Sequence, residues 1–522
     1  MKRALLVWAA AAIAAMPSWS QTAARPAPPK VKLVLAITVD QFRYDYLVRF
    51  RDSYHAGLAR LWKQGAVFSN AHYEHFPTVT AIGHSTLLSG ALPTTSGIVG
   101  NEWYDRELGK QVTSVEDAAH KLVGATGTGA SPKYLLVSTL SDEMKMAARG
   151  KPKAFGISIK DRSAILPIGR MGDGAFWFDD ETGNFVSSTY YGARLPEWVD
   201  DFNRRRDADK FLAAEWKPID NPRGELFRKM EIKASQPYYA AMERTPYGNE
   251  LLLMLAQRAV TGEKLGQREE TDLLSVSFSS NDYVGHDYGP DSPRVRDISI
   301  RTDRTLGQLF DFLDKQVGMR NVLVVLTADH GVAPLPELMV ERKMPGARRS
   351  RTDLHKRIQA RLTELYGEGT WILGRSGPAP YFNLELMLRK KLDLAEVRER
   401  AAEVVRASPH MARVYTRDQL AKGQVPGDPV DRRVLNGFHA QRSSDLFIVS
   451  EPYHMFEEKG TSHGSPYNYD SHVPIILMGP GVKPGKYLRR AAVNDIAPTL
   501  ASLLEVEAPS GSIGRILEEA LY

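Results

Sequence analysis

A short run of residues, Pro77 to Ser85, places hydroxyl groups just before a segment with helical character. The segment Ala81 to Leu88 predicts a helix that ends at Gly90. A hydroxyl at a helix start lies among free backbone N–H groups at the positive end of the dipole, where anions bind and an alkoxide forms more readily. Thr78 and Thr80 both stand there. Taken alone, the stretch favours an N-cap, and a nucleophile is the alternative.

Acidic and histidine side chains recur at the C-terminal ends of predicted strands, as Asp40, Asp282 and Asp329 show. The short apolar runs 31–39, 273–278 and 321–326 are typical of buried strands, and a fourth such run covers 473–478. Strands that alternate with helices predict a mostly parallel sheet, whose sites form outside the carboxyl ends of its strands. We therefore expect the side chains at these strand ends on one rim. They are Asp40, Asp282, His286, Asp329, His330 and His472.

These six side chains have the chemistry of metal ligands. Three carboxylates and three imidazoles, in a chain without cysteine, suit zinc at an open catalytic site. With Thr80 they are enough for two ions. Each residue alone also fits a turn, a helical i,i+4 pair or a buried histidine, and it is their repetition at strand ends that favours metal. We leave His84 and His463 outside the ligand set, as groups that can orient ligands.

The elements that must position these residues predict an α/β fold. The chain has 522 residues, of which 43% are hydrophobic, so it can bury a large core. We expect a mostly parallel central sheet flanked by helices, with inserted subdomains. Residues 31–331 and 462–522 are predicted to form the core, with an irregular insertion at about 175–260, and residues 332–461 an inserted subdomain. Ser292 and Pro293 predict a helix to Gln316, and Ser131 is predicted to cap a helix over 133–148.

The N-terminus predicts export. Lys2 and Arg3 precede the apolar run Leu5 to Met16, which is typical of a signal peptide over residues 1–20 followed by a leader over 21–30. A retained anchor is the alternative; no later apolar run has spanning length. The absence of cysteine suits the bacterial periplasm. The net charge of +6 favours anionic substrates weakly and gives no specific case for nucleic acid. We expect a monomer.

Seven of these positions, in order along the chain, resemble the alkaline phosphatase superfamily. The motifs are TVDQFRYDYL with Asp40, PTVTAIGHSTLLSG with Thr80, NDYVGHDYGP with Asp282 and His286, LTADHGVAP with Asp329 and His330, and HGSPYNYDSHVP with His472. Within the superfamily the chain looks like the branch with a threonine nucleophile. Nucleotide pyrophosphatase/phosphodiesterases and the phosphate-irrepressible periplasmic alkaline phosphatases share that branch. The resemblance runs from about residue 31 to residue 505.

The resemblance implies a ligand set and a nucleophile. One zinc ion would be held by Asp40, Thr80, Asp329 and His330, and the other by Asp282, His286 and His472. Thr80, rather than Thr78, matches the nucleophile, which would form a covalent phosphothreonine that water hydrolyses. There is no clear ligand set for a third metal. No serine nucleophile is present, and sulfatases need a Cys or Ser where Thr80 stands.

The resemblance also bears on the substrate. Asn101 matches an amide found in both kinds of relative, whereas Lys160 and Arg162 match the cation pair of the monoesterases. By themselves these two cations are typical of surface ion pairs, and the resemblance reverses that interpretation. A monoester dianion needs more positive charge than a diester. We therefore predict a phosphomonoesterase, an alkaline phosphatase acting on small-molecule phosphate monoesters. A phosphodiesterase or nucleotide pyrophosphatase is the alternative, and a non-catalytic periplasmic phosphate- or zinc-binding protein is the alternative of another class.

Overall fold

The computed structural model describes residues 30–229 and 237–522. The predicted signal peptide, and the predicted leader up to residue 29, lie outside the described residues. Across the two described ranges, no helix is both long enough and apolar enough to cross a membrane.

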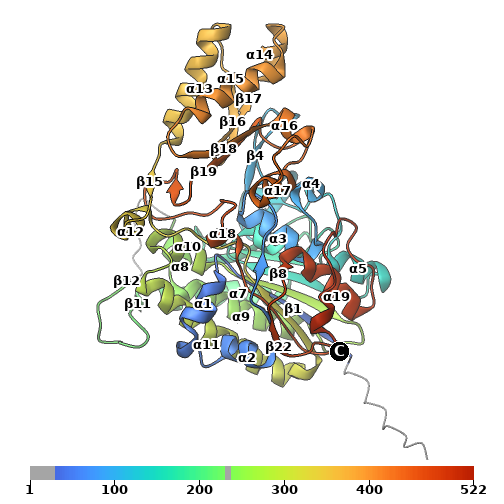
Figure 1. The fold of residues 1–522 in the computed structure, drawn as a ribbon. Coiled ribbons are helices and arrows are strands. Elements are labelled where there is room, and N and C mark those ends of the chain that lie inside the picture. Colours follow the sequence, from blue (N-terminus) through green and yellow to red (C-terminus); the bar gives the residue numbers. More distant parts are fainter. Residues whose placement is uncertain (1–29, 230–236) are drawn as a thin grey trace, which may run out of the picture.

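A large sheet forms the centre of the molecule (Figure 1). Five neighbouring strands run parallel, in the order β14 (Val322–Thr327), β1 (Leu33–Val39), β13 (Asp272–Phe278), β8 (Ala154–Ser158) and β9 (Gly174–Asp179). Antiparallel strands extend the sheet on both sides, beginning with β21 (Ile475–Met478) next to β14 and β10 (Asn184–Ser188) next to β9. The predicted α/β fold with a mostly parallel central sheet is confirmed.

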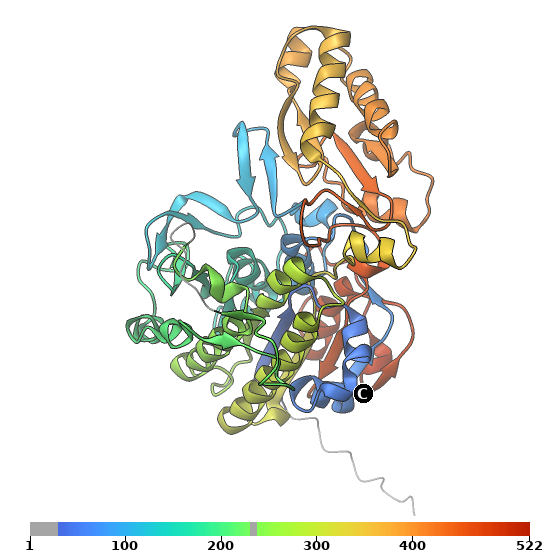
Figure 2. The ribbon, with the colours of Figure 1, turned by 90° about the vertical axis from the view of Figure 1, so that its left-hand side faces the viewer.

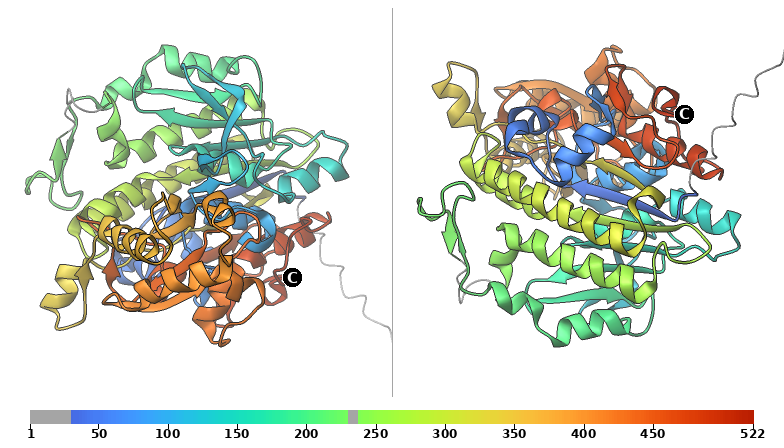
Figure 3. Two further views of the ribbon diagram at one scale, coloured as in Figure 1. Left: turned by 90° about the horizontal axis from the view of Figure 1, so that it is seen from above. Right: turned by 90° about the horizontal axis from the view of Figure 1, so that it is seen from below.

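Helices cover both faces of this sheet, which explains why its central strands are continuous apolar runs (Figures 1 and 3). Every residue of β1, β13 and β14 is buried. One face carries α2 (Gly57–Gln64), α9 (Pro246–Glu263) and α11 (Pro293–Gln316); the other carries α3 (Thr80–Ser89), α6 (Asp161–Ile165) and α19 (Ile496–Leu504). Helix α11 has the predicted bounds, and the Ser292 hydroxyl accepts a hydrogen bond from Arg294 N.

Helix α3 packs against the end of β14 through a glycine. A Cβ atom on Gly83 would lie 2.2 Å from the Asp329 carbonyl oxygen, so no larger residue fits at this close approach. Thr80 is the first residue of the helix, and Val79 is the N-cap without a side-chain capping bond. The helix ends at Gly90, whose φ of 65° suits glycine. Neither Thr80 nor Thr78 is therefore the N-cap that the stretch taken alone favours: Thr78 Oγ1 instead donates to the Ser465 carbonyl, at 2.9 Å.

A smaller lobe, which we call the upper lobe, stands above the rim of the sheet (Figures 1 and 2). It is built from helices α13 (Arg351–Tyr366) and α15 (Leu394–Arg406) and from the strand pairs β16 (Ile372–Ser376) with β17 (Ala379–Phe382) and β18 (Met411–Thr416) with β19 (Leu446–Ser450). The lobe has its own apolar core, formed by Leu354, Ile358, Leu362, Trp371, Val397, Val405 and their neighbours. A hairpin of β4 (Glu102–Asp105) and β5 (Lys110–Thr113) reaches up to it, and Glu102 pairs with Arg375 at 3.2 Å.

One predicted helix is only half as long in the structure as the sequence predicts. Of the run 133–148, only α5 (Leu140–Ala147) is helical. The Ser131 hydroxyl donates to Asp117 Oδ2 at 2.5 Å and accepts from Lys133 N at 3.2 Å, but the residues that follow it form a turn and not a helix. The cap is Thr139, which forms a capping box with Asp142. A second capping signal eight positions downstream therefore sets the true start of this helix.

Candidate active site

Four neighbouring parallel strands deliver polar side chains to one rim, as the parallel arrangement requires. Strand β1 leads into Asp40, β14 into Asp329 and His330, and β8 into Lys160. Strand β13 leads into α10 (Ser280–Tyr288), which carries Asp282 and His286. The sheet thus gathers residues that are far apart in the sequence.

Asp40, Asp329 and His330 form what we call the first ligand group. All three are buried. His330 Nε2 lies 3.5 Å from Asp40 Oδ1 and 3.3 Å from Asp329 Oδ2. Among the described residues, neither of these two carboxylate oxygens has a hydrogen-bond partner. Burying oxygens without a partner costs free energy. A cation bound between these side chains would accept their electron pairs.

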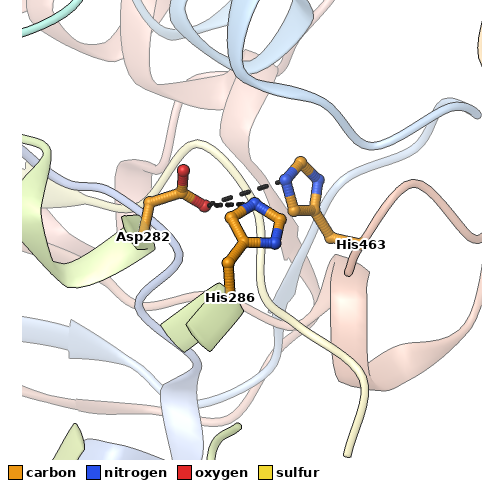
Figure 4. Close-up of side chains that lie close together, drawn as sticks. All are labelled: Asp282, His286 and His463. Carbon is orange, nitrogen blue, oxygen red and sulfur yellow. Dashed lines mark ion pairs between the residues drawn. The ribbon is translucent and has the colours of Figure 1, made fainter. Parts of the chain in front are cut away.

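Asp282, His286 and His463 form the second ligand group (Figure 4). His286 Nε2 lies 3.1 Å and His463 Nε2 3.7 Å from Asp282 Oδ1. The His463 ring stacks on the ring of His330, with centroids 3.4 Å apart, so the two groups are adjacent.

The protein fixes the orientation of all three imidazoles through the backbone. The Nδ1 atoms of His330, His286 and His463 donate to the carbonyls of Gly331, Thr461 and Thr78, at 2.9, 2.7 and 2.8 Å. A proton on Nδ1 leaves Nε2 as the ring atom that faces the carboxylates and is available to a metal ion. Backbone carbonyls commonly orient metal-binding histidines in this way. The two groups therefore fit two divalent ions, and nitrogen and oxygen donors without thiolates suit zinc.

Lys160 and Gln41 link the two groups. Lys160 Nζ lies 2.6 Å from Asp40 Oδ2 and 2.6 Å from Asp282 Oδ2. Gln41 donates from its backbone N to Asp329 Oδ1 at 3.1 Å and from Nε2 to Asp282 Oδ1 at 2.6 Å. A Cβ atom on Gly285 would lie 1.7 Å from Gln41 Oε1, so glycine is needed there to admit this side chain.

The local electrostatics reflect the crowding of acids. Burial, reinforced by the charge of Asp329, raises the pKa of Asp40 well above its ordinary value. Burial also raises the pKa of Asp329 to about 6. Burial alone lowers the pKa of Lys160, but the charges of Asp282 and Asp40 outweigh it and raise that pKa. The rim thus concentrates negative charge that one ammonium only partly balances, which favours cation binding.

Thr80 lies beside the first ligand group, and Asn101 secures its helix. Thr80 Oγ1 is 3.4 Å from His330 Nε2, and both side chains are buried. Asn101 Oδ1 accepts a hydrogen bond from Ala81 N at 2.8 Å, so this distant amide caps the helix start that Val79 leaves open. With its oxygen used in this way, the Asn101 amide keeps its NH₂ as a donor for an anion.

A cleft of about 540 Å³ opens from the second ligand group toward the upper lobe. Its floor includes His286, His463, Asn101 and Arg162. Among the described residues, the buried Nε of Arg162 has no hydrogen-bond partner. The upper wall is partly aromatic, and its rings belong to Phe76, Tyr381, Phe447, Tyr453 and Phe456. The site can therefore take an anion at its floor and a larger group above it.

Known proteins are similar to this chain in sequence and in fold. The sequence matches the family of type I phosphodiesterases / nucleotide pyrophosphatases over residues 34–472. This chain belongs to that family, within the alkaline phosphatase superfamily. The resemblance of the sequence to the alkaline phosphatase superfamily is therefore confirmed.

Two relatives are similar over nearly the whole chain. Alkaline phosphatase PafA of Elizabethkingia meningoseptica is 37% identical over 522 residues, which is 95% of each chain. Alkaline phosphatase PhoV of Synechococcus elongatus is 36% identical over 96% of this chain and 94% of its own. The crystal structure of wild type PafA superposes with a TM-score of 0.89, at 36% identity, and covers 95% of this chain and 99% of that one. Murine ectonucleotide pyrophosphatase/phosphodiesterase 5 shares the fold, with a TM-score of 0.52 and 16% identity.

For this member of the family, one predicted ligand is misplaced. His472 does not face the second ligand group, because its Nε2 donates to the Ser69 carbonyl at 2.9 Å and its ring stacks between those of Tyr44 and His72. His463, which we left outside the ligand set, takes that place. His84, also left outside, is buried beside the first ligand group: its Nδ1 donates to the Thr80 carbonyl at 2.9 Å and lies 3.4 Å from Asp329 Oδ2.

The sequence alone does not identify Gln41 or His463 as members of the site. His463 lies in a loop rather than at a strand end, and the strand-end rule therefore selected His472, which precedes β21. The only available signal was its neighbourhood, a histidine followed by Gly464, Ser465 and Pro466, which indicates a tight turn. The other six predicted ligand and nucleophile positions lie together at the rim.

Proposed function

We propose that this chain is a zinc-dependent phosphomonoesterase, an alkaline phosphatase, in which Thr80 forms a covalent phosphothreonine. The observation that carries this proposal is the position of the buried Thr80 hydroxyl, 3.4 Å from His330 Nε2 and beside two adjacent ligand groups. The relatives PafA and PhoV, both named alkaline phosphatases, support a monoesterase.

In this proposal each ligand group holds one zinc ion, with Thr80 completing the first. Such ions supply Lewis acidity and charge neutralisation to phosphoryl transfer. The backbone-fixed imidazoles and Gln41 set the positions of these ions before the substrate arrives, because each ring is held by a carbonyl. The fixed arrangement avoids reorganisation during the reaction.

The phosphate of the substrate is held by the side chains at the floor of the cleft. The Asn101 NH₂ donates to one oxygen, the Arg162 guanidinium grips others, and Lys160 supplies a further positive charge. Arg162 and Asn101 both line the cleft, whereas Lys160 lies between the two ligand groups. This surplus of donors suits the dianion of a monoester.

The reaction then proceeds in two displacements. Thr80 Oγ loses its proton to solvent and attacks phosphorus, the bond from phosphorus to the leaving oxygen breaks, and the leaving group takes a proton from solvent. Water next attacks the phosphothreonine, the Thr80 Oγ–P bond breaks, Thr80 regains a proton, and inorganic phosphate leaves. Because Thr80 is the first residue of helix α3, the positive end of the helix dipole stabilises negative charge on Oγ and on the phosphoryl group.

The substitution Thr80→Ala tests the nucleophile. We expect hydrolysis of an aryl phosphate monoester to fall at least about 1,000-fold, since covalent catalysis is lost. Thr80→Ser is the matched control, because it keeps a hydroxyl and should retain labelled phosphate on the protein after acid quenching. Equal turnover by wild type and Thr80→Ala would overturn Thr80 as the nucleophile, whereas no turnover by wild type would favour a protein that only binds phosphate or zinc.

The substitution Arg162→Ala tests the substrate class. We expect monoester hydrolysis to fall about 100-fold and hydrolysis of the matching diester much less, because the diester lacks the second negative charge. Equal losses would overturn the role of Arg162. A wild-type preference for the diester would favour the phosphodiesterase or nucleotide pyrophosphatase that the family description also allows.

We further propose that the enzyme acts as a monomer in the bacterial periplasm on small-molecule substrates, without binding nucleic acid specifically or spanning the membrane after signal cleavage. The basic and apolar N-terminal residues support export. Fractionation of expressing cells tests this: activity released with the periplasm, on a protein lacking residues 1–20, is the expected result. Its sedimentation should be that of a single chain.

A further inference from the structure

A third set of nitrogen and oxygen donors lies where the upper lobe joins the core. This set, which we call the junction cluster, consists of His410, Glu451 and His454, whose donor atoms lie within 4.8 Å of one another. His410 directly precedes β18, Glu451 directly follows β19, and His454 begins β20 (His454–Met455). Strand β20 pairs with β15 (Ala347–Arg348), so the cluster joins one strand pair of the lobe to another beneath it.

The backbone holds the three residues as one unit. Glu451 N donates to the His410 carbonyl at 3.0 Å, and His454 N donates to the Glu451 carbonyl at 3.2 Å. The Nδ1 of His454 donates to the Pro452 carbonyl at 2.9 Å, so its Nε2 carries the lone pair. This is the same carbonyl anchoring that orients the imidazoles of the two ligand groups.

The spacing of the side chains is close to that of ligands on one ion. His410 Nδ1 lies 3.0 Å from Glu451 Oε2. Two ligands about 2.0 Å from a tetrahedral ion are about 3.3 Å apart. The His410 and His454 rings lie nearly parallel, with centroids 4.2 Å apart, and their donor atoms lie within 4.8 Å of one another and of Glu451.

The charges nearby are compatible with a cation of moderate affinity. Glu451 supplies one negative charge, and burial lowers the pKa of His454, which keeps its imidazole neutral. Arg349 opposes a cation, but its guanidinium is engaged by Ser450 Oγ at 2.6 Å and by the Pro409 carbonyl at 2.8 Å. His410 and Glu451 have side chains 46% and 45% exposed, so an ion can enter from solvent.

We propose that the junction cluster binds a divalent transition-metal ion such as Zn²⁺, separately from the two ligand groups of the candidate active site. His410, Glu451 and His454 supply three ligands, and water completes a four-coordinate site. The ion ties the end of the β18–β19 pair to β20. Because His454 and its neighbours Tyr453 and Met455 line the cleft, a bound ion also restrains that wall.

Equilibrium dialysis of the metal-loaded protein against a series of free Zn²⁺ concentrations tests the site. We expect wild type to take up one equivalent more than His410→Asn or Glu451→Gln. Loss of either ligand should lower the affinity for this extra Zn²⁺ ion by at least about tenfold. Removing a group that only orients a metal ligand already costs that much. Added Zn²⁺ should also raise the Tm of wild type more than that of either variant.

Both substitutions fall on half-exposed side chains, and a matched control checks that they leave the fold intact. His120 Nε2 lies 3.7 Å from Asp117 Oδ2, yet within the described residues this pair belongs to no three-ligand group. His120→Asn should therefore keep the extra equivalent. Identical Zn²⁺ uptake by wild type, His410→Asn and Glu451→Gln would overturn the proposal. Because uptake is measured without substrate, this result is independent of whether Thr80 is a nucleophile.

Discussion

The two ligand groups are built in different ways. Asp40, Asp329 and His330 come directly from the ends of the adjacent strands β1 and β14, and all three side chains are fully buried. In the second group, Asp282 and His286 share helix α10, but His463 arrives on a loop from a distant part of the chain. His286 has a side chain that is 31% exposed.

The difference shows which part of such a site a sheet can specify. The first group carries two carboxylates in a buried setting and needs only correct strand pairing. The second carries one carboxylate and depends on a loop held by Thr78, whose carbonyl accepts from His463 Nδ1. We therefore expect the first group to bind its ion more tightly, and the second to be the more easily disturbed.

The largest expected effect separates His463 from His472. His463→Asn should lower kcat/KM for an aryl phosphate monoester by about 100-fold or more, since a ligand facing Asp282 is lost. His472→Asn should change kcat/KM by less than about threefold, and only destabilise the fold by about 1 kcal/mol through lost stacking. Steady-state kinetics on both variants decides this. A severe loss in His472→Asn with a mild one in His463→Asn would restore the assignment that the sequence suggested.

Stepwise removal of metal should distinguish the two groups directly. In His410→Asn, which lacks the ion of the junction cluster, dialysis against increasing chelator should release one of the two remaining equivalents at least about tenfold earlier than the other, because one more buried carboxylate strengthens the attraction to a divalent ion. In His463→Asn the early equivalent should be missing while the late one remains. Metal analysis of the dialysed protein measures both steps, and simultaneous release of two equal equivalents would contradict the comparison.

The substitution Gln41→Gly should weaken the second group alone. Gln41 has a φ of 62°, which glycine adopts without strain, so the backbone N–H to Asp329 is kept while the side-chain bond to Asp282 is lost. We expect the affinity for the early-released ion to fall about tenfold. The affinity for the late-released ion should not change. Gln41→Asn, which keeps the amide on a shorter side chain, serves as the control. Equal weakening of both ions would show that Gln41 acts through the backbone.

The smallest effect concerns the loop that carries His463. Asp470 Oδ2 accepts a hydrogen bond from Ser465 N at 2.7 Å, and burial raises the Asp470 pKa to about 7. A raised carboxyl pKa means that the folded state keeps its proton longer, so this group makes the free energy of unfolding fall as pH rises from about 4 to 7. In Asp470→Asn the free energy of unfolding should fall less over this pH range. Denaturant unfolding at pH 5 and pH 8 measures it, and an unchanged difference between the two pH values would refute the role of burial.

The sequence predicted most of the core because local patterns and global fold agree there. Apolar runs such as 273–278 and 321–326 became buried parallel strands, and the Ser292-Pro293 signal gave α11 its bounds. Prediction failed where two local signals competed. Ser131 and Thr139 are both good caps, and only the structure shows that the helix begins after Thr139, which forms a capping box with Asp142.

By itself the sequence predicted that Asp40, Asp329 and His330 meet at one rim, because residues at the carboxyl ends of neighbouring parallel strands lie at the same edge of a sheet, whereas Thr80 was placed beside them by the family resemblance. Only the tertiary structure decided that His463 and not His472 faces Asp282, and that Asn101 caps the helix of Thr80. Loops carry no periodic signal that fixes where their side chains point. Contacts such as those of His463 with Thr78 and of His472 with Ser69 form only after distant segments have packed.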